Sequence, residues 1–488
     1  MNIADFLSES AAKRPHGIAA ITKSRALSFE ALEHAVWQIA MEMHQAGIGP
    51  GDAVGMLFQH QLDYLAASLA MIRIGAIQIG FSTNSTAHTL QDLSARVGIK
   101  AFLTDIPGFK SPKLPTHRPI LNSFLLKTEP LDPGIRHVDV NAPYLLISGS
   151  GTTGTPKLIA VSTATYLDIK PRDDATRPML PGERQFSPSA INFYTAHRRC
   201  LNGIAAGATS VFRDDVEPIF SICDFFAVDH LSLVPLFADN MLANLAPDAR
   251  AYRLPDLKST LIGGSPVSEE LRHKFRERIS PHLTVVYGAN EYGETTAAPP
   301  AMQDMHPGCV GAPCPGVTLE IVNAADEALP PGEVGLVRIK TGNVFSGYVG
   351  DAEATADALR NGWYYPGDLG LLTKDNVLVF KGRADDMMIY NGINIYPREI
   401  EVILESHPAV IEAAAFPLPS RINHHVPVAA VSLRSATGEA ELIAYCQARI
   451  GALAPRHILI IDALPRNAAG KILKRELAGY FTPAPTTT

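Results

Sequence analysis

Helix-like and strand-like segments alternate along the first 180 residues of the chain, and this alternation limits the folds that the chain can adopt. Residues 28–45 carry apolar side chains at helical spacing, and the apolar run 53–58 that follows has the length of a strand. Residues 65–80 then predict a buried helix and a second strand, and 101–104 repeats the strand pattern. Such alternation predicts layered α/β structure whose strands are largely parallel.

The pattern changes after residue 317, where short strands replace the alternation. Residues 319–322 and 335–340 predict two strands, and the Pro-Pro-Gly turn between them favours an antiparallel pairing. Beyond residue 385 the chain predicts a compact α+β module of about 100 residues, which is a normal domain size. Within this module we expect helices at 397–405 and 440–450 and strands at 410–416, 426–433 and 458–461.

The length of 488 residues exceeds what a single hydrophobic core usually supports, so we expect at least two domains. The changes of pattern divide the chain into a large N-terminal part and a small C-terminal part. We therefore predict an α/β protein with a large N-terminal domain, residues 1–383, built of layered α/β subdomains with a small β section. A small α+β domain, residues 384–488, follows it.

Composition and charge indicate a protein that acts on a small molecule. Hydrophobic residues make up 46% and charged residues 19%, which is ordinary for a globular protein. The net charge of −7, without any local run of Lys and Arg, gives no electrostatic reason to expect nucleic acid as a partner. The most apolar stretch, 65–80, contains Arg73 and is too short to span a bilayer, and the N-terminus has no apolar leader. We therefore expect neither a membrane span nor a secretory signal.

The cysteines are few and scattered, which suits free thiols in a reducing compartment and predicts a cytoplasmic protein. Cys309 and Cys314 lie close to His306 in the sequence and invite a metal site. Their spacing fits no common zinc pattern, so we favour thiols without a metal. The five cysteines are Cys200, Cys223, Cys309, Cys314 and Cys446.

The strongest local signal is the segment 148–157, Ser-Gly-Ser-Gly-Thr-Thr-Gly-Thr-Pro-Lys, which follows the apolar strand 144–147. Its glycines let the backbone bring N–H groups to an anion, its hydroxyls add donors, and Lys157 adds a positive charge. It differs from the G-x-x-x-x-G-K-[ST] loop, because the hydroxyls precede the lysine. A run of Gly, Ser and Thr is by itself usually a linker, but the preceding strand and the trailing Pro-Lys favour a phosphate loop.

This segment resembles the phosphate loop of the acyl-adenylate-forming superfamily, which includes acyl- and aryl-CoA ligases, luciferases and the adenylation domains of peptide synthetases. The family's remaining motifs have similar counterparts, in the family's order, over nearly the whole chain. They are Gly-Gly-Ser-Pro at 263–266, Tyr-Gly-Ala-Asn-Glu at 287–291, Tyr-Pro-Gly-Asp-Leu-Gly at 365–370, the hinge and its following strand and helix at 382–386 and 391–401, and Leu-Pro-Arg-Asn-Ala-Ala-Gly-Lys at 464–471.

The resemblance implies a role for each motif. Joining a carboxylate to the α-phosphate of ATP brings two anions together, and Lys471 is implied as the catalytic cation that neutralises them. Glu291 is implied as a second catalytic residue and as the ligand of Mg²⁺, a cation that prefers carboxylate and phosphate oxygens. Asp368 is implied to accept from the ribose hydroxyls, and Tyr287 to stack on adenine. The residues implied in ATP or AMP binding are Ser148, Ser150, Gly151, Thr152, Thr153, Gly154, Lys157, Gly264, Ser265, Tyr287, Gly288, Asn290, Asp368 and Arg383.

The resemblance also implies that the small C-terminal domain is mobile. Asp385 stands at the family's hinge, where a charged, solvent-facing residue can absorb a large change in backbone angles. In the family this rotation presents one face of the domain for adenylation and another for thioester formation. Asn391 and Gly392 are implied to approach the thiol arm of the acceptor, which is CoA or the phosphopantetheine of a carrier protein.

The sequence departs from the family's pattern at several positions. Asn290 replaces the usual Thr, and Tyr390 stands where many relatives carry a Lys. The His that relatives often carry before the acid pocket is missing, and Asn192 and Phe193 fall near its position. Asn192 either hydrogen-bonds a polar substituent of the acid or caps a helix. The residues implied in acid binding are Asn192, Phe193, Gly263 and Gly288.

The leading hypothesis is an AMP-forming ligase that joins an acyl or aryl acid to CoA, with ATP and Mg²⁺ as cofactors. The alternative is a free-standing ligase that loads a separate carrier protein with an aryl, acyl or amino acid. An amino acid is the less favoured substrate, because the Asp that binds an α-ammonium group has no clear counterpart here. A catalytically inactive nucleotide-binding regulator is disfavoured by Lys471, Glu291, Asp368 and Arg383. A luciferase-like oxygenase is disfavoured as a rare specialisation of the family.

Overall fold

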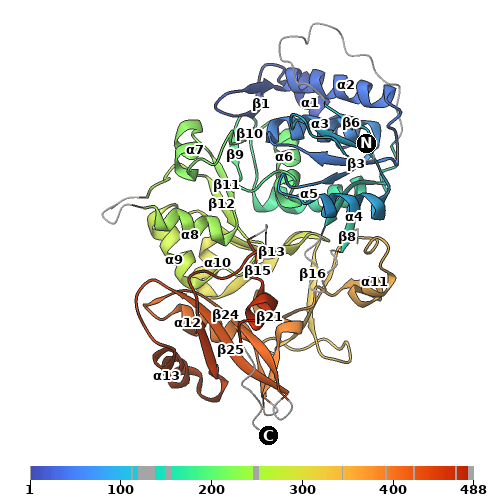
Figure 1. The fold of residues 1–488 in the computed structure, drawn as a ribbon. Coiled ribbons are helices and arrows are strands. Elements are labelled where there is room, and N and C mark those ends of the chain that lie inside the picture. Colours follow the sequence, from blue (N-terminus) through green and yellow to red (C-terminus); the bar gives the residue numbers. More distant parts are fainter. Residues whose placement is uncertain are drawn as a thin grey trace.

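The strands form three sheets in the described part of the chain, and the N-terminal and C-terminal segments occupy opposite ends of the molecule (Figure 1). No helix among the described residues is long and apolar enough to cross a membrane. The computed structural model describes residues 2–111, 114–118, 138–148, 157–245, 252–342, 345–390, 393–420, 424–467 and 470–481.

The first sheet has the strand order β6-β5-β3-β4-β7-β8, and all its pairs are parallel except β7 with β8. Its helices begin and end at the residues that the sequence favours for these positions. The Ser28 side chain accepts from the Ala31 N–H at the start of α2, and Gly75 ends α3 with a φ of 73°. The elements are α1 (Asp5–Lys13), α2 (Phe29–Gln45), β3 (Ala53–Leu57), α3 (Gln61–Ile74), β4 (Ile77–Gly80), α4 (Ala87–Val97), β5 (Ile99–Thr104), β6 (Thr116–His117), β7 (Pro143–Ser148), β8 (Leu158–Ser162) and α5 (Thr163–Thr176).

The second sheet contains a parallel half with the order β13-β12-β11-β9-β10-β1, and β2 pairs antiparallel with β1. The chain runs from β9 through α6 to β10 and then crosses back through α7 to β11, on the other side of β9. In open α/β sheets, ligands bind outside the carboxyl ends of the strands where the order reverses in this way. The elements are β1 (Ile18–Ile21), β2 (Ala26–Ser28), β9 (Arg184–Phe186), α6 (Tyr194–Ala206), β10 (Thr209–Val211), α7 (Ile219–Phe226), β11 (His230–Leu233), α8 (Pro235–Ala243), β12 (Ser259–Ile262), α9 (Glu269–Arg278) and β13 (Leu283–Ala289).

The same sheet continues as an antiparallel half, in which β14 pairs with β13 and β15 joins β14 to β21. The predicted antiparallel strands β16 and β17 are confirmed, with Leu319 opposite Ile339. The predicted small β section is therefore part of the large sheet. The elements are β14 (Gly293–Ala298), α10 (Pro300–Met305), β15 (Cys309–Pro313), β16 (Thr318–Val322), β17 (Gly335–Lys340), α11 (Ala352–Ala358), β18 (Leu359–Arg360), β19 (Trp363–Tyr364), β20 (Asp368–Leu372) and β21 (Leu378–Arg383).

The third sheet lies in the C-terminal part of the chain and has the order β23-β22-β25-β24, with β26 parallel to β25. It has its own hydrophobic core, in which Ile400 of α12 and Val431 of β25 are fully buried. The expected α/β fold, with a large N-terminal and a smaller C-terminal domain, is confirmed. The elements are η1 (Ala384–Asp386), β22 (Met388–Tyr390), β23 (Ile393–Ile395), α12 (Pro397–Glu405), β24 (Val410–Ser420), β25 (His424–Leu433), α13 (Glu439–Ile450), η2 (Gly451–Leu453), β26 (His457–Ile460) and α14 (Lys474–Ala478).

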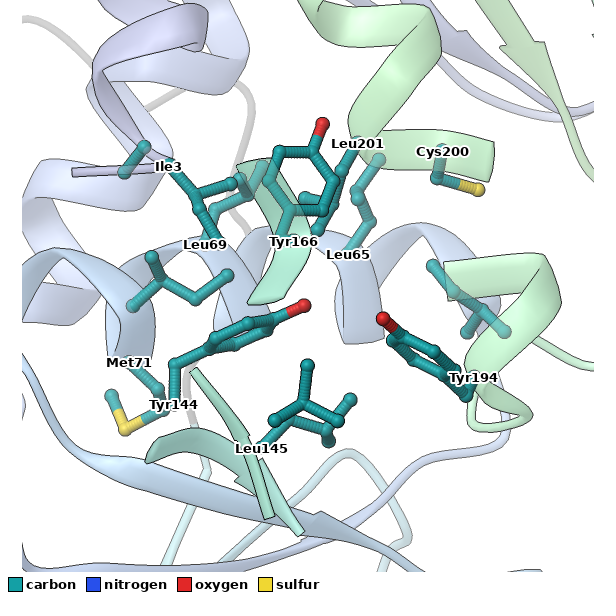
Figure 2. Close-up of a cluster of buried hydrophobic side chains, with 14 of the residues drawn as sticks. Ile3, Leu65, Leu69, Met71, Tyr144, Leu145, Tyr166, Tyr194, Cys200 and Leu201 are labelled. Carbon is teal, nitrogen blue, oxygen red and sulfur yellow. The ribbon is translucent and has the colours of Figure 1, made fainter. Parts of the chain in front are cut away.

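The main core of the N-terminal part lies where α3, α5 and α6 meet β7 (Figure 2). Leu65 and Leu69 of α3 fill its centre, and the hydroxyl groups of Tyr144 and Tyr194 point toward each other within it. Burial raises the pKa of both phenols, and that of Tyr194 reaches about 12. This core holds α6 against the first sheet and so fixes the loop that leads from β9 into α6.

Candidate active site

The predicted phosphate loop begins at Ser148 and ends at Lys157. Ser148 is the exposed last residue of β7 and pairs with Leu158 of β8, so the two ends of the loop lie side by side. The Nζ of Lys157 lies 4.7 Å from the centre of the Tyr348 ring. The loop therefore leaves the first sheet at Ser148 and returns to it at the paired position on β8, beside the ring of Tyr348. The predicted phosphate-binding residues Ser150, Gly151, Thr152, Thr153 and Gly154 lie outside the described residues.

Glu291 stands in the connection from β13 to β14, as does the half-buried Asn290. The hydroxyl of Tyr348 donates to Oε1 of Glu291 over 2.8 Å. Burial raises the pKa of Tyr348, and the Glu291 carboxylate raises it further. Tyr348 thus contacts both Glu291, the predicted metal ligand, and Lys157, the lysine of the phosphate loop. Sequence reasoning missed Tyr348, since a single tyrosine in a connection carries no periodic or motif signal.

Asp368 is the centre of a buried polar group. It is only 7% exposed, and its Oδ2 accepts from the Tyr287 hydroxyl over 2.5 Å. Its Oδ1 accepts from Nη1 of Arg383 over 3.0 Å, because Asp368 and Arg383 are paired residues of β20 and β21. Burial raises the pKa of Asp368, and the Arg383 guanidinium opposes that rise. A carboxylate has about four acceptor positions, so Asp368 keeps the capacity to accept from further hydroxyls.

The predicted glycines bring bare backbone to the same region. A Cβ on Gly263 would lie 2.7 Å from the carbonyl oxygen of Val286, and one on Gly288 would lie 2.0 Å from the carbonyl oxygen of Gly293. Gly264, which precedes the half-buried Ser265, has a φ of +88° that other residues rarely adopt. At Gly263 and Gly288 the neighbouring backbone fills the space that a side chain would need, so glycine at these positions allows the strands to approach closely.

Lys471 comes to this site from the C-terminal end of the chain. A Cβ on Gly470, the residue before it, would lie 3.6 Å from the side chain of Leu236 in α8 and 4.0 Å from that of Val234, which follows β11. The Lys471 N–H donates to Oδ1 of Asn467 over 2.9 Å. Lys471 is exposed at the surface. The surrounding protein still removes part of its hydration, and this desolvation, together with the nearby Arg383 guanidinium, lowers the pKa of Lys471. Lys471 therefore lies in a region that already carries positive charge and favours anions.

Asp385 lies in η1, between the last strand of the second sheet and the first strand of the third. Its side chain is 69% exposed, and Oδ2 lies 3.8 Å from Nη2 of Arg383. An exposed residue at the connection between two sheets fits the predicted hinge, which remains a prediction. Asn391 and Gly392, the predicted contacts of the thiol arm, lie outside the described residues.

The predicted acid-binding residues Asn192 and Phe193 stand at the start of α6. Phe193 is the N-cap residue of the helix, and its N–H donates to the Ala190 carbonyl over 3.0 Å. A Cβ on Gly80, at the end of β4, would lie 3.0 Å from Cβ of Asn192. Asn192 is therefore one residue before the cap, and it lies against the first sheet. Its role as a contact of the acid stays a prediction.

The polar and charged groups of the site fit a nucleoside triphosphate with its cation. Buried Asp368 retains acceptor capacity for sugar hydroxyls, and Lys157, Arg383 and Lys471 supply positive charge for phosphates. Glu291 supplies a carboxylate oxygen, which Mg²⁺ prefers. Sequence reasoning also missed the buried polar residues beneath this region, among them Arg177, Arg199 and Ser232, because nothing local in the sequence distinguishes them from surface residues.

Comparison with known proteins places the chain in a family. The family model described as AMP-binding enzyme matches residues 7–349, and the model described as AMP-binding enzyme C-terminal domain matches residues 399–471. The chain is 28% identical to the fatty acid–[acyl-carrier-protein] ligase ScoC of Streptomyces coeruleorubidus, over 95% of this chain and 93% of that protein. It is 29% identical to the 2-succinylbenzoate–CoA ligase of Geobacillus kaustophilus, over 97% of each. ATP-bound MatB from Rhodopseudomonas palustris has the same fold, with a TM-score of 0.89 and 22% identity over 99% of each chain. The chain belongs to the family of AMP-binding enzymes.

Proposed function

We propose that the protein is an AMP-forming acid–thiol ligase, which activates a carboxylic acid with ATP as its acyl-adenylate and transfers the acyl group to CoA. The observation that carries this proposal is that Lys471 lies near enough to Asp368 and Arg383 for their charges to influence its pKa. Two of these residues belong to paired strands, and the third comes from a loop of the C-terminal part of the chain. A mobile cation beside a fixed site for a nucleotide suits a reaction that joins two anions.

ATP would lie across the carboxyl ends of the parallel strands. Asp368 would accept from the ribose hydroxyls, held in orientation by Tyr287 and Arg383. The ring of Tyr287 would stack on adenine, and the bare backbone at Gly264 would allow close approach. The phosphates would lie between the 148–157 loop and Arg383, with Ser265 and Asn290 as further donors.

Glu291 would hold Mg²⁺, with the Tyr348 hydroxyl fixing the orientation of its carboxylate. The cation, when bound, supplies neutralisation of the phosphate charges. Lys471 would donate to the carboxylate of the acid and to the α-phosphate as they approach each other, and so stabilise the charge that develops between them. Burial and the nearby Arg383 guanidinium lower the pKa of Lys471, and a bound polyanion would oppose both effects.

We further propose that residues 384–488 form a domain that rotates about Asp385 after adenylation and moves Lys471 away. Asn391 and Gly392 would then approach the thiol arm. The connection around Asp385 is exposed and short, which supports this position for the hinge. Asn192, Phe193, Gly263 and Gly288 would border the acid.

The acceptor is proposed to be CoA, in line with relatives such as the 2-succinylbenzoate–CoA ligase and the feruloyl-CoA synthase of Amycolatopsis, which is 29% identical to this chain. The carrier-protein alternative has support from the ScoC ligase, a relative whose name gives an acyl-carrier protein as its acceptor. Both acceptors present the same thiol-bearing arm, so the adenylation site is the same in either case.

The proposal is tested by acid-dependent release of pyrophosphate from ATP, measured over a panel of fatty, aryl and amino acids. At least one fatty or aryl acid is expected to release pyrophosphate as its acyl-adenylate forms, and AMP should form in equal amount once a thiol acceptor is present. Addition of CoA or of a phosphopantetheinylated carrier protein then identifies the acceptor by the thioester formed. Formation of ADP and phosphate, or no acid-dependent release with any acid, would refute the proposal.

A further inference from the structure

A narrow pocket lies at the switch point of the parallel strands, behind the loop that joins β9 to α6. Its walls include Ser187 of that loop, Arg199 and Cys200 of α6, Ser210 of β10 and Ser232 of β11. The cavity volume is about 20 Å³, which is enough for one water-sized group. The cavity thus has room for the end of a ligand but not for a whole acid.

The pocket lies below the carboxyl end of β11, where the chain passes close to the residue before Lys471. Ser232 precedes Val234 by two positions, and Val234, which follows β11, lies 4.0 Å from where a Cβ on Gly470 would stand, next to Lys471. Two residues of a strand span about 7 Å. The floor of the pocket is therefore about 7 Å below the edge at which Lys471 would act.

The floor of the pocket presents donors. The Ser232 Oγ accepts from Nη1 of Arg177 over 2.7 Å and from Nη1 of Arg199 over 3.0 Å. These two bonds occupy both lone pairs of the hydroxyl, so its O–H is left to donate. Among the described residues, the buried Nε of Arg199 has no partner. A buried donor without an acceptor is costly, and an acceptor group of a ligand would satisfy it.

The charge beneath the floor is also unbalanced. Arg199 pairs with Glu294 over 2.7 Å, and Arg198 pairs with Asp173 over 2.5 Å. Arg177 is only 4% exposed, and no carboxylate of the described residues lies within ion-pair distance of it. Burial and the neighbouring Arg199 lower the pKa of Arg177 to about 9, so it stays charged at neutral pH. The group therefore carries a buried positive charge in excess, which an electronegative ligand group would stabilise.

Cys200 does not supply a competing acceptor. Burial raises the pKa of its thiol to about 12, so the thiol stays protonated. Its sulfur points away from the apolar core at the edge of that cluster (Figure 2), and it lines the pocket instead. The Ser232 hydroxyl and the Arg199 Nε thus remain as donors at the floor of the pocket.

We propose that this pocket recognises an oxygen acceptor on the acid, a second carboxylate, a carbonyl or a hydroxyl group, carried about 7 Å from the carboxylate that is activated. Ser232 and Arg199 are then specificity-determining residues. The inference rests on the proposed ligase function and narrows its substrates to bifunctional acids. A methyl group in the same position would leave the Ser232 hydroxyl and the Arg199 Nε without partners.

The test compares matched acids on the wild-type enzyme by acid-dependent pyrophosphate release. The pairs are hexanedioate with hexanoate, and 4-hydroxybenzoate with 4-methylbenzoate. Because buried donors reject an analogue that lacks the acceptor, the oxygen-bearing acid of at least one pair is expected to have a kcat/KM about 10²-fold higher. A preference below about tenfold in both pairs, or turnover only of acids outside them, overturns the inference and leaves the proposed function intact. Absence of pyrophosphate release with every acid overturns the proposed function instead.

Ser232→Ala provides a second measurement. The variant should reduce the preference within the favoured pair by about tenfold, mainly through a higher KM for the oxygen-bearing acid. Equal losses for both members of the pair would indicate a structural role only and would contradict the inference. Ser280→Ala is the matched control, because Ser280 is fully buried beyond α9 and does not line the pocket. Melting temperatures of both variants report whether the fold is retained.

Discussion

The carboxylate of Asp368 and the guanidinium of Arg383 face each other across β20 and β21, with Oδ1 and Nη1 3.0 Å apart. The pair is held in the register of two hydrogen-bonded strands, so neither side chain depends on a loop for its position. The next residues after Arg383 form η1 and lead into the third sheet. The rigid edge of the proposed nucleotide site and the proposed hinge are therefore adjacent in the chain.

Asp368→Asn should weaken ATP binding. Asparagine keeps the size of the side chain but loses the charge that strengthens hydrogen bonds from hydroxyls, and such bonds contribute about 1.5–3 kcal/mol. The Kd for ATP, measured by calorimetry without acid, should rise by about 10- to 10²-fold. Asp304→Asn removes a carboxylate that pairs with Arg276 on the surface and should leave the Kd unchanged. An unaltered Kd in Asp368→Asn would remove Asp368 from the nucleotide site.

Tyr348→Phe should lower the affinity of the proposed metal site for Mg²⁺ without abolishing Mg²⁺ binding. The variant deletes the hydroxyl that donates to Glu291 and keeps the ring beside Lys157. Loss of one bond to a charged group predicts an increase of about tenfold in the Mg²⁺ concentration needed for half-maximal rate. Tyr365→Phe is the control, since that hydroxyl donates to Asp326 over 3.1 Å. The assignment of Glu291 is wrong if both variants respond to Mg²⁺ alike.

His197 should make the protein sensitive to mild acid. It is 2% exposed, its Nε2 lies 2.7 Å from Oγ of Ser68, and burial lowers its pKa to about 4. Between the unfolded pKa of about 6.5 and the folded value the unfolded state binds the proton, so stability falls as the pH is lowered through this range. The full effect is about 3 kcal/mol.

The His197→Gln variant should therefore lose less stability than the wild type between pH 6.5 and pH 4, as measured by the thermal midpoint. His16→Gln changes an exposed histidine and serves as the control. If the wild type and His197→Gln lose stability in parallel, the histidine is not held neutral in the folded protein.

Asp385→Pro should impair the change between the two half-reactions and leave ATP binding intact. Proline fixes φ at the proposed hinge, and in the described part of the chain Asp385 forms no hydrogen bond or ion pair with Ser148 or Lys157. Pyrophosphate release in a single turnover should stay near the wild-type rate, whereas thioester formation should slow by about tenfold or more. Thioester formation at the wild-type rate would place the hinge elsewhere.

Segments with regular periodicity were predictable from the sequence. The helix expected at 28–45 is α2, Phe29–Gln45, with Ser28 as its cap, and the helix expected at 397–405 is α12. The strand expected at 410–416 extends further, to Ser420. Its extension contains Pro417 and Pro419, which sequence reasoning takes as the end of a strand. They are tolerated because β24 pairs with β25 alone and lies at the edge of its sheet.

Motifs in the sequence single out Asp368, Glu291 and Lys471 as site residues, and their roles stay predictions. Partners such as Tyr348 were not predictable. Tyr348 lies 57 positions from Glu291, and Arg199 lies 95 positions from Glu294. Such contacts depend on how strands are ordered in a sheet, and no local pattern encodes that order.

Lys471→Ala, followed through the two half-reactions separately, tests the account most directly. If Lys471 neutralises the charge between the carboxylate and the α-phosphate, the variant should form acyl-adenylate on the order of 10²–10³ more slowly. Thioester formation from preformed acyl-adenylate and CoA should be far less affected, because Lys471 is then turned away. Arg475→Ala, which changes another cation of the same C-terminal segment, is the control. Acyl-adenylate formation at the wild-type rate in Lys471→Ala, or equal losses in both steps, would contradict the account.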